Sequence, residues 1–538
     1  MDISRRRLIQ LGGTATAAAA VPVLSEMPAS SRPPLRWTAK TAADMPEPDL
    51  AALLLNRAAF GPRPGDVEKA RQMGPLAWIE WQLDHEAIDD SAVEERINRE
   101  LATLSMSSRQ IWTNYRMNNQ GQIFQELALA TLYRMMFSQR MLYEVMVEFW
   151  TDHFSMDFRT DNVVFFKTAD DKAVVRQHAL GKFKDLLTAS AESPAMLNYL
   201  NNDVSRKGNP NENYAREIME LHTLGAAVNG VPYTETDVKE VARCFTGWSW
   251  DNGPTSPTWG EFEFRQGDHD NGVKTVLGEF IASNNFKADG DLVIDILCNH
   301  PATARFLATK LIRRFVTDDP VGQVPELVDS VAETYRRSDG DIKEMVYAIL
   351  SSQQFANSFA TYGGRLSRPM DFLARSFRVA DVPSESVPLS AAQRAQLFNR
   401  LSYALETMGH VPFYWPTPDG YPDDKDAWSS SIGILTRWNV GLSLCGVASG
   451  TNNNLGAQMV PGFLPHEQTP AEVTTAGAAV DYWIDRLLHR PMADADRALM
   501  VEFLTNGGQA SAPLDRSPQS RLPSTIALIL DSPYFQWR

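Results

Sequence analysis

The segment NPNENYAREIMELHTLG, residues 209–225, has the pattern of a capped helix that is apolar around most of its circumference. Because successive helical residues are turned by about 100°, Asn213, Glu217 and Glu220 share one narrow polar stripe, with Arg216 beside it. A helix at a protein surface normally shows a broader polar face. The pattern therefore predicts a helix that lies mostly inside the fold and turns a thin acidic stripe toward other groups.

Two interpretations of this stripe stay open. Two neighbouring carboxylates oriented by an arginine suit general acid–base catalysis or the binding of a cation. Alternatively, Arg216 and Glu220 form an i,i+4 ion pair on an exposed edge, which stabilises a helix by only about 0.2–0.5 kcal/mol. On the first interpretation the candidate catalytic residues are Glu217, Glu220 and Arg216.

A second candidate site lies in GDHDNGVKTVLG, residues 267–278. Asp268, His269 and Asp270 offer oxygen and nitrogen ligands within one loop, and a divalent metal is the cofactor that they would hold. The loop is not an EF-hand, since Gly272 falls one place early and no glutamate stands at the twelfth position. The alternative is a hydrogen-bonded turn rich in Asp and Asn.

The other acidic and histidine-containing stretch is EVMVEFWTDHF, residues 144–154. Glu144 and Glu148 follow one another at helical spacing, whereas His153 falls on the apolar side and is predicted to be a core residue. His222 is predicted to lie in the last turn of its helix, where the helix dipole favours it. Neither histidine is predicted to bind a ligand.

Helical periodicity dominates the chain from residue 48 onward. It predicts, among others, a long helix over 120–157. Strand patterns are scarce, and the best is the alternation of Phe262 and Phe264 within residues 261–281, which predicts a small hairpin. The predicted fold class is mainly α, a large multi-helix globular fold with one small β-hairpin.

The N-terminus, SRRRLIQLGGTATAAAAVPVL at residues 4–24, has paired arginines before a mildly apolar run rich in Gly and Ala. This is the pattern of a twin-arginine export signal, so we expect the protein in the periplasm or at the cell exterior, with the membrane involved only through the signal segment. The predicted organisation is a signal at 1–30, a linker at 31–47, a helical core at 48–380, and a C-terminal helical part at 381–538 that contains a long loop rich in Pro, Asp and aromatic residues.

Composition and motifs exclude several classes of function. The chain has 51 Lys plus Arg against 66 Asp plus Glu and a net charge of −15, and it has no basic tract longer than three residues beyond the N-terminus. A nucleic-acid partner is therefore not expected. HExxH, GxSxG, P-loop and dinucleotide-binding motifs are also missing. The cysteines Cys244, Cys298 and Cys445 stand in apolar patterns and are predicted to be buried free thiols.

Several of these stretches together resemble the DUF1800 family, a bacterial family named only as a domain of unknown function. The resemblance spans roughly residues 48–535 and rests on NENYAREIMELHTLG, YTETDVKEVARCFTGWSW, HDNGVKTVLG, HPATARFLATKLIRRFV and SDGDIKEMVYAILSSQQF. It implies an exported, helix-rich protein that is often encoded beside a sulfatase-like partner family. It implies no catalytic residue, so the candidate sites rest on spacing alone.

Three hypotheses of function remain, and whether the chain is an enzyme stays open. The first is a metal-assisted or carboxylate-based hydrolase that acts on an envelope or extracellular polymer through Glu217 and Glu220. The second is a non-catalytic scaffold or accessory subunit of an exported, sulfatase-like partner. The third is a carbohydrate-binding protein in which exposed loop aromatics stack on the sugar rings of a glycan. The alternative is that these aromatics are buried core residues; they are Trp248, Trp250, Trp259, Tyr414, Trp415, Tyr421 and Trp428.

Overall fold

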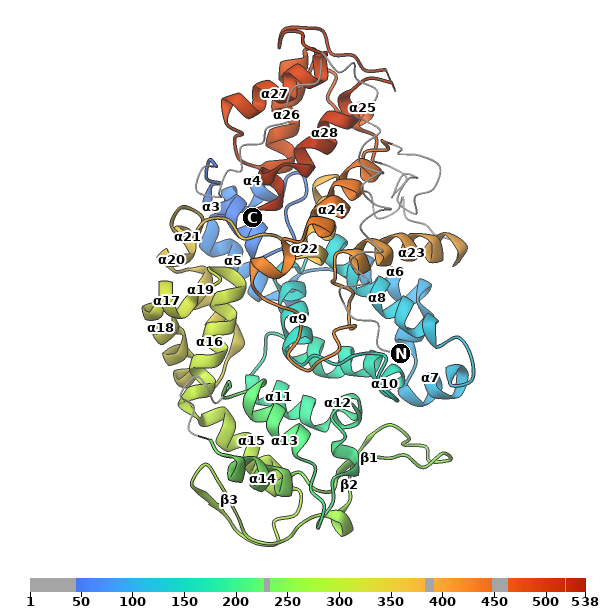
Figure 1. The fold of residues 1–538 in the computed structure, drawn as a ribbon, viewed down its shortest axis with the longest axis vertical. Helices are drawn as coiled ribbons and strands as arrows, with labels where there is room; N and C mark the ends of the chain where they lie inside the picture. The colour runs from blue at the N-terminus through green and yellow to red at the C-terminus, as the bar shows by residue number, and fades with distance from the viewer. Residues whose placement is uncertain (1–44, 227–232, 383–390, 448–462, 518) are drawn as a thin grey trace. The chain divides into compact units, whose positions relative to one another are not determined.

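The structure is a computed structural model that describes residues 45–226, 233–382, 391–447, 463–517 and 519–538. It confirms the predicted fold class: the protein is mainly α, and its strands form two small antiparallel sheets (Figure 1). The predicted export signal lies outside the described residues. None of the helices in the described ranges is both long and apolar enough to cross a membrane.

The chain folds into two compact units that are interleaved in sequence. The first unit contains the residues up to Trp78, Ala356–Val411 and Asp423–Arg538, and the second contains Ile79–Phe355 and Pro412–Pro422. The boundary predicted at residue 380 lies within the first unit, in Ala356–Val411, and not between the two units. The short segment Pro412–Pro422 is part of the second unit although both of its flanks belong to the first.

The helices of the second unit surround an apolar core whose largest fully buried side chains include Trp150, Trp248 and Tyr214. The short helix α5 (Pro75–Leu83) leads into this unit and α20 (Gln353–Ala356) leads out of it. Its helices are α6 (Ser91–Glu100), α7 (Ser108–Tyr115), α8 (Gln120–Phe137), α9 (Met141–His153), α10 (Val163–Asp170), α11 (Phe183–Glu192), α12 (Pro194–Tyr199), α13 (Glu212–Glu220), α14 (Glu235–Cys244), α15 (Ala288–Asn299), α16 (Pro301–Phe315), α17 (Pro320–Gln323), α18 (Pro325–Arg337) and α19 (Ile342–Leu350).

The single helix predicted over residues 120–157 is two helices, α8 and α9, with a break at residues 138–140. The break is stabilised by side chains that accept the main-chain N–H groups released there. Asp90 accepts the N–H of Gln139 at 2.8 Å, and the hydroxyl of Ser138 accepts the N–H of Arg140 at 2.9 Å. Apolar periodicity continues across the break, which is why the pattern alone did not show it.

The first unit is also helical, and its core includes Trp483, Tyr534 and Phe535. Its helices are α3 (Leu50–Arg57), α4 (Asp66–Met73), α21 (Ser358–Tyr362), α22 (Pro369–Val379), α23 (Ala391–Thr407), α24 (Ser431–Leu444), α25 (Pro465–Gln468), α26 (Ala476–Leu488), α27 (Asp494–Thr505), α28 (Leu522–Asp531) and α29 (Pro533–Gln536). As predicted, Cys244 and Cys298 in the second unit and Cys445 in the first unit are buried, free thiols. Burial raises the pKa of the Cys298 thiol to about 12, so this cysteine is not a reactive thiolate.

The strands form two pairs within the second unit. β1 (Trp248–Trp250) pairs with β2 (Phe262–Phe264), and β3 (Lys274–Val276) pairs with β4 (Glu279–Ile281). A hairpin was predicted from Phe262 and Phe264, and these residues do form a strand, but its partner precedes it in sequence. The partner strand was not predicted because all three of its residues are buried, so that it lacks the alternation typical of a half-buried strand.

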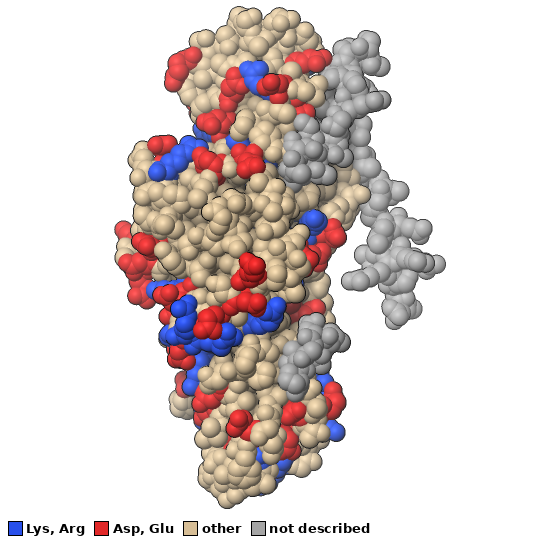
Figure 2. All heavy atoms as spheres, turned by 90° about the vertical axis from the view of Figure 1, so that its left-hand side faces the viewer, with Lys and Arg blue, Asp and Glu red and all other residues tan. Residues whose placement is uncertain are grey.

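Charged side chains of both signs are interleaved on the face shown in Figure 2. This face therefore carries no uninterrupted basic patch.

Candidate functional site

Helix α13 presents the thin acidic stripe that the sequence predicts. Its N-cap residue, Asn211, accepts the N–H of Asn213 at 2.9 Å. The side chains on the core side are fully buried, whereas Glu217 and Glu220 are half-buried. The two carboxylates therefore lie at the edge of the core, where neighbouring charges act on them more strongly than in open water. The buried residues are Tyr214, Ala215, Ile218 and Met219.

Arg216, the predicted orienting residue, is bound to a different helix. Its two terminal nitrogens donate to the carboxylate of Glu235 in α14, each at 2.8 Å, and Glu212 lies 3.7 Å away. The guanidinium thus joins α13 to α14. It offsets only part of the negative charge on the stripe.

Burial raises the pKa of Glu217 to about 6, and the negative charges of Glu220 and Asp419 act in the same direction. The positive charge of Arg216 opposes the shift without cancelling it. A carboxyl group with such a pKa holds its proton in about half of the molecules at pH 6 and in about a tenth of them at pH 7. This is the property that a general acid requires.

Asp419 belongs to the segment Pro412–Pro422, which is bound firmly within the second unit. The main-chain oxygen of Phe413 accepts the N–H of Phe158 at 2.8 Å. The ring of Tyr414 stacks on Phe124 at a centroid distance of 4.2 Å. These contacts fix the first half of the segment. We call the whole segment, Pro412–Pro422, the aromatic loop.

The second half of the aromatic loop passes against the end of helix α9. Gly420 has a φ of +75°, and a Cβ atom there would lie 2.3 Å from the main-chain oxygen of Asp152. Only glycine fits this close approach of two main chains. The position of Asp419 therefore depends on its glycine neighbour.

Aromatic side chains lie close to the carboxylates of the site. The indole nitrogen of Trp415 donates to Asp419 at 2.8 Å, and the rings of Trp415 and Tyr421 are 4.9 Å apart. Burial and then the charge of Asp157 raise the pKa of Tyr199 to about 12, with smaller contributions from Asp419 and Glu217, and its hydroxyl donates to the main-chain oxygen of Pro416 at 3.4 Å. We call Glu217, Glu220, Asp419, Tyr199 and Trp415 the Glu217 cluster.

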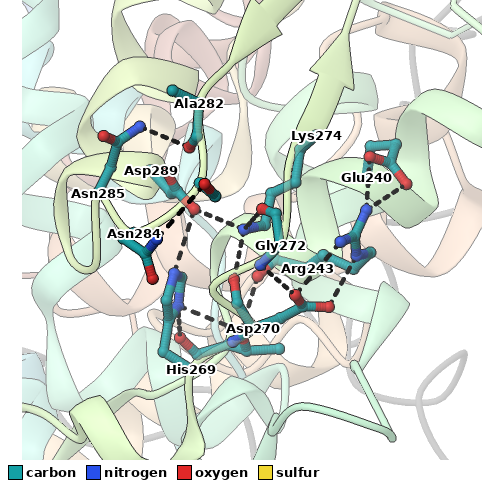
Figure 3. A network of polar contacts seen from close by, with 12 residues as sticks. Glu240, Arg243, His269, Asp270, Gly272, Lys274, Ala282, Asn284, Asn285 and Asp289 are labelled. Atoms are coloured by element: carbon teal, nitrogen blue, oxygen red, sulfur yellow. Dashed lines mark hydrogen bonds and ion pairs between the residues drawn. The ribbon is translucent and has the colours of Figure 1, made fainter.

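The predicted metal loop is organised around a lysine (Figure 3). The side chain of Lys274 is completely buried, and its ammonium group donates to Asp289 at 2.6 Å, to the main-chain oxygen of Gly272 at 2.9 Å, and to the main-chain oxygen of Asp270. The oxygen atoms of this loop do surround a cation. In the structure that cation is the ammonium group of Lys274.

The three residues predicted to hold a metal have other partners. His269 is fully buried, with Nδ1 2.7 Å from the main-chain oxygen of Thr246 and Nε2 3.2 Å from Asp289. A carbonyl oxygen can only accept, so Nδ1 carries a proton. Nε2 bonds Asp289 in turn, so neither ring nitrogen is free for a metal.

Asp270 is paired with an arginine through its side chain, and Asp268 makes a main-chain contact. Hydrogen bonds from Arg243 at 2.8 and 3.2 Å lower the pKa of Asp270 to about 2. Asp268 accepts the N–H of Lys207 through its main-chain oxygen. Within the described residues, Asp268, His269 and Asp270 form no group whose ligand atoms all lie within 4.8 Å of one another, so a metal here stays a prediction that needs a rearrangement.

The acidic residues of α9 are engaged by arginines. Arg176 bonds both oxygens of Glu144 at 3.0 and 3.1 Å, and Arg314 lies 3.3 Å from Glu148. All of these groups are buried or nearly so, and removing either partner of such a pair leaves an uncompensated charge. Their arrangement indicates a structural role.

Sequence reasoning did not single out Asp419 or Tyr199 as members of the site. The only local signal was the density of aspartate and aromatic residues in the loop, because nothing in the spacing shows that residues 412–422 lie in the same unit as α13. It also did not bring His153 and His222 together, although the structure places the Nε2 atom of His153 3.0 Å from the main-chain oxygen of His222.

Comparisons with known proteins agree with the resemblance in the sequence. A search of curated proteins and a search of solved structures returned no match to this chain. The family model described as "Protein of unknown function (DUF1800)" matches residues 53–537, nearly the whole chain. The chain therefore belongs to the DUF1800 family.

Proposed function

We propose that this protein is an exported, carboxylate-based hydrolase of an envelope or extracellular glycan, with Glu217 as its general acid. The observation that carries the proposal is the raised pKa of Glu217, about 6, beside a second carboxylate. The half-buried ring of Trp415, whose indole nitrogen donates to Asp419, supports a sugar substrate, because aromatic faces bind the apolar faces of sugar rings.

The chemistry needs two carboxyl groups in opposite states. Protonated Glu217 donates its proton to the oxygen that leaves when the glycosidic bond breaks. A second carboxylate, Glu220 or Asp419, takes a proton from the attacking water, whose oxygen becomes bonded to the anomeric carbon. The two groups return to their starting states by exchanging protons with water.

The raised pKa of Glu217 in this cluster supports a carboxylate-based reaction. Glu217, Glu220 and Asp419 do not form a group whose ligand atoms all lie within 4.8 Å of one another in the part of the chain that the structure describes. An ion held by all three carboxylates at once would require that spacing. Burial and the charges of Glu220 and Asp419 instead leave one carboxyl, Glu217, with a raised pKa, as in enzymes that use two carboxylates in different environments.

The test is hydrolysis of a panel of bacterial envelope and extracellular polysaccharides, followed as the release of reducing ends between pH 5 and 7. Glu217→Gln is expected to lower turnover by about 10²–10⁴-fold, the usual contribution of a general acid. Glu220→Gln and Asp419→Asn identify the second carboxylate, which is the one whose loss has a comparable effect. Glu212→Gln, on the same helix, serves as the matched control and is expected to keep full turnover.

Melting temperatures show whether a variant that has lost turnover is still folded. The proposal holds if Glu217→Gln melts within a few degrees of the wild-type protein and has lost turnover. It fails if wild-type protein degrades no polymer of the panel, or if Glu217→Gln retains its rate. Binding of a glycan without turnover in wild-type protein would instead support the second candidate, a carbohydrate-binding protein, which the half-buried ring of Trp415 also favours.

Export rests on residues 4–24, and partnership with an exported, sulfatase-like protein rests on the family resemblance alone. Replacement of Arg5 and Arg6 by lysine is expected to retain the protein in the cytoplasm, measured by cell fractionation. Equal amounts of wild-type and variant protein in the periplasmic fraction would contradict the twin-arginine proposal.

A further inference from the structure

Two histidines meet in the interior of the second unit. His153 ends helix α9, and His222 lies two residues beyond helix α13. Each side chain is about 1% exposed, and the centroids of the two rings are 5.9 Å apart. The contact joins the two stretches of sequence that carry the acidic stripe and the acidic residues of α9.

The hydrogen bonds leave ring nitrogens of this pair without partners. Nε2 of His153 lies 3.0 Å from the main-chain oxygen of His222, and since a carbonyl only accepts, Nε2 carries the proton and Nδ1 keeps a free lone pair. Nδ1 of His153 and both ring nitrogens of His222 have no hydrogen-bond partner among the residues that the structure describes. Leaving a buried polar group unsatisfied costs about 1–3 kcal/mol, and such a group in a native fold calls for a bound water or ion.

The surroundings of the pair are aromatic. The ring of Phe154 lies 4.7 Å from that of His153 and 4.8 Å from that of His222, and Trp150 meets His153 edge-on at 5.2 Å. Both imidazoles are neutral: burial and then the positive charge of Lys310 lower the pKa of His222 to about 3, and the same two causes hold the pKa of His153 well below its usual range.

We propose that His153 and His222 together bind one monovalent copper ion. A metal–nitrogen bond is about 2.0–2.1 Å long, so two imidazoles that share one ion place their ring centres at most about 6 Å apart. The observed 5.9 Å is within that limit. The free lone pair of His153 supplies one ligand and a ring nitrogen of His222 supplies the other.

The charge of the site selects a monovalent over a divalent ion. The rings packed against the pair are aromatic, and the two imidazoles bring no negative charge that would offset the charge of an ion. A divalent ion would add two uncompensated charges in this apolar space. Monovalent copper adds one, is soft and polarisable, accepts imidazole nitrogen, and is satisfied by two ligands.

The test measures copper directly and does not depend on the proposed hydrolase activity. The full chain is produced in copper-supplied cells, purified under reducing, oxygen-free conditions and dialysed against a chelator, and its copper and zinc are then measured by mass spectrometry. We expect about one copper ion per chain in the wild-type protein, and about a tenth or less of that in His153→Gln and His222→Gln. His178→Gln, a half-buried histidine elsewhere in the same unit, is the matched control and is expected to keep its copper.

A second measurement covers the case in which the glutamine variants do not fold. X-ray absorption of wild-type protein is expected to show a near shell of nitrogen atoms only, with the edge of monovalent copper. The inference is overturned if the wild-type protein carries no copper, if zinc takes its place, if the near shell contains sulfur, or if both folded variants keep as much copper as the wild type.

Discussion

Both terminal nitrogens of Arg216 lie 2.8 Å from the carboxylate oxygens of Glu235, so the arginine beside Glu217 is held by a neighbouring helix. Burial and the charge of Glu220 then outweigh it, and the pKa of Glu217 rises to about 6. Arg243 gives the opposite result, because it bonds Asp270 directly and the pKa of that carboxyl falls to about 2. Whether an arginine donates to the carboxylate, and not its proximity alone, decides the direction of the shift.

Glu217→Gln is predicted to change stability in a pH-dependent way. The folded-state pKa of Glu217, about 6, is above its unfolded value of 4.5. The resulting stabilisation is complete below pH 4.5 and is lost as the pH rises through 6, so at pH 8 the buried charge costs up to about 2 kcal/mol. The difference in the free energy of unfolding between Glu217→Gln and wild type should therefore change by about 1–2 kcal/mol in favour of the variant between pH 4.5 and pH 8.

The measurement is urea unfolding of both proteins across that range, with Glu212→Gln as the control. The control variant should follow the wild-type curve at a constant offset. A constant offset for Glu217→Gln as well would show that Glu217 titrates like an exposed carboxyl.

Lys274→Met is predicted to destabilise the protein by about 3–5 kcal/mol, because it leaves the buried carboxylate of Asp289 without its ammonium partner. Burial alone would raise the pKa of Asp289, but the hydrogen bonds from His269 and Lys274 outweigh it and hold that pKa below its usual range. The double variant Lys274→Met, Asp289→Leu should recover part of the loss. Denaturant unfolding of the two single variants and the double variant gives the coupling energy. Additive losses would contradict the buried pair.

Gly420→Ala is predicted to displace the aromatic loop, since its Cβ would lie 2.3 Å from the main-chain oxygen of Asp152. Gly208→Ala is the matched control, because Gly208 also has a positive φ, +84°, but a Cβ there meets nothing within 4 Å. In both variants the positive φ lowers the free energy of unfolding by about 1 kcal/mol. Only Gly420→Ala should also weaken glycan binding or turnover, measured by titration and by release of reducing ends. Equal losses in the two variants would mean that the loop position does not matter.

Metal-free protein is predicted to lose stability as the pH falls, and His222→Gln is predicted to reduce that loss. The folded-state pKa of His222, about 3, is below its unfolded value of 6.5. The unfolded chain therefore binds the proton first, and stability falls as the pH drops from 6.5 toward 3, by at most about 5 kcal/mol from this residue. The melting temperatures of the two proteins, followed from pH 7.5 to pH 4, should converge as the pH falls. Parallel curves would contradict a buried neutral His222.

The sequence predicted the helical class and the acidic stripe well, because both depend on the spacing of apolar residues along one segment. Helix α13 forms where the stripe was predicted, and Glu217 and Glu220 are half-buried at the edge of the core. The partner of Arg216 could not be predicted, since Glu235 lies in another helix and the contact depends on how the two helices pack.

The histidines and the metal loop show the same limit. His153 was correctly expected to be buried, but the sequence does not show that His222 lies beside it with unpartnered nitrogens. In the loop at 267–278 a metal was predicted at Asp268, His269 and Asp270, and the spacing did not show that Lys274 donates to main-chain oxygens of the same loop. A lysine that folds back onto its own loop is a tertiary feature that periodicity does not report.

The proton affinity of Glu217 is the central claim, and an infrared titration measures it most directly. The difference between the spectra of wild-type protein and Glu217→Gln isolates the carboxyl band of this residue between pH 3 and pH 9. We predict a midpoint at about pH 6, shifting toward the ordinary value in Glu220→Gln. A midpoint at or below about 4.3, the value of an exposed glutamate, would contradict the account.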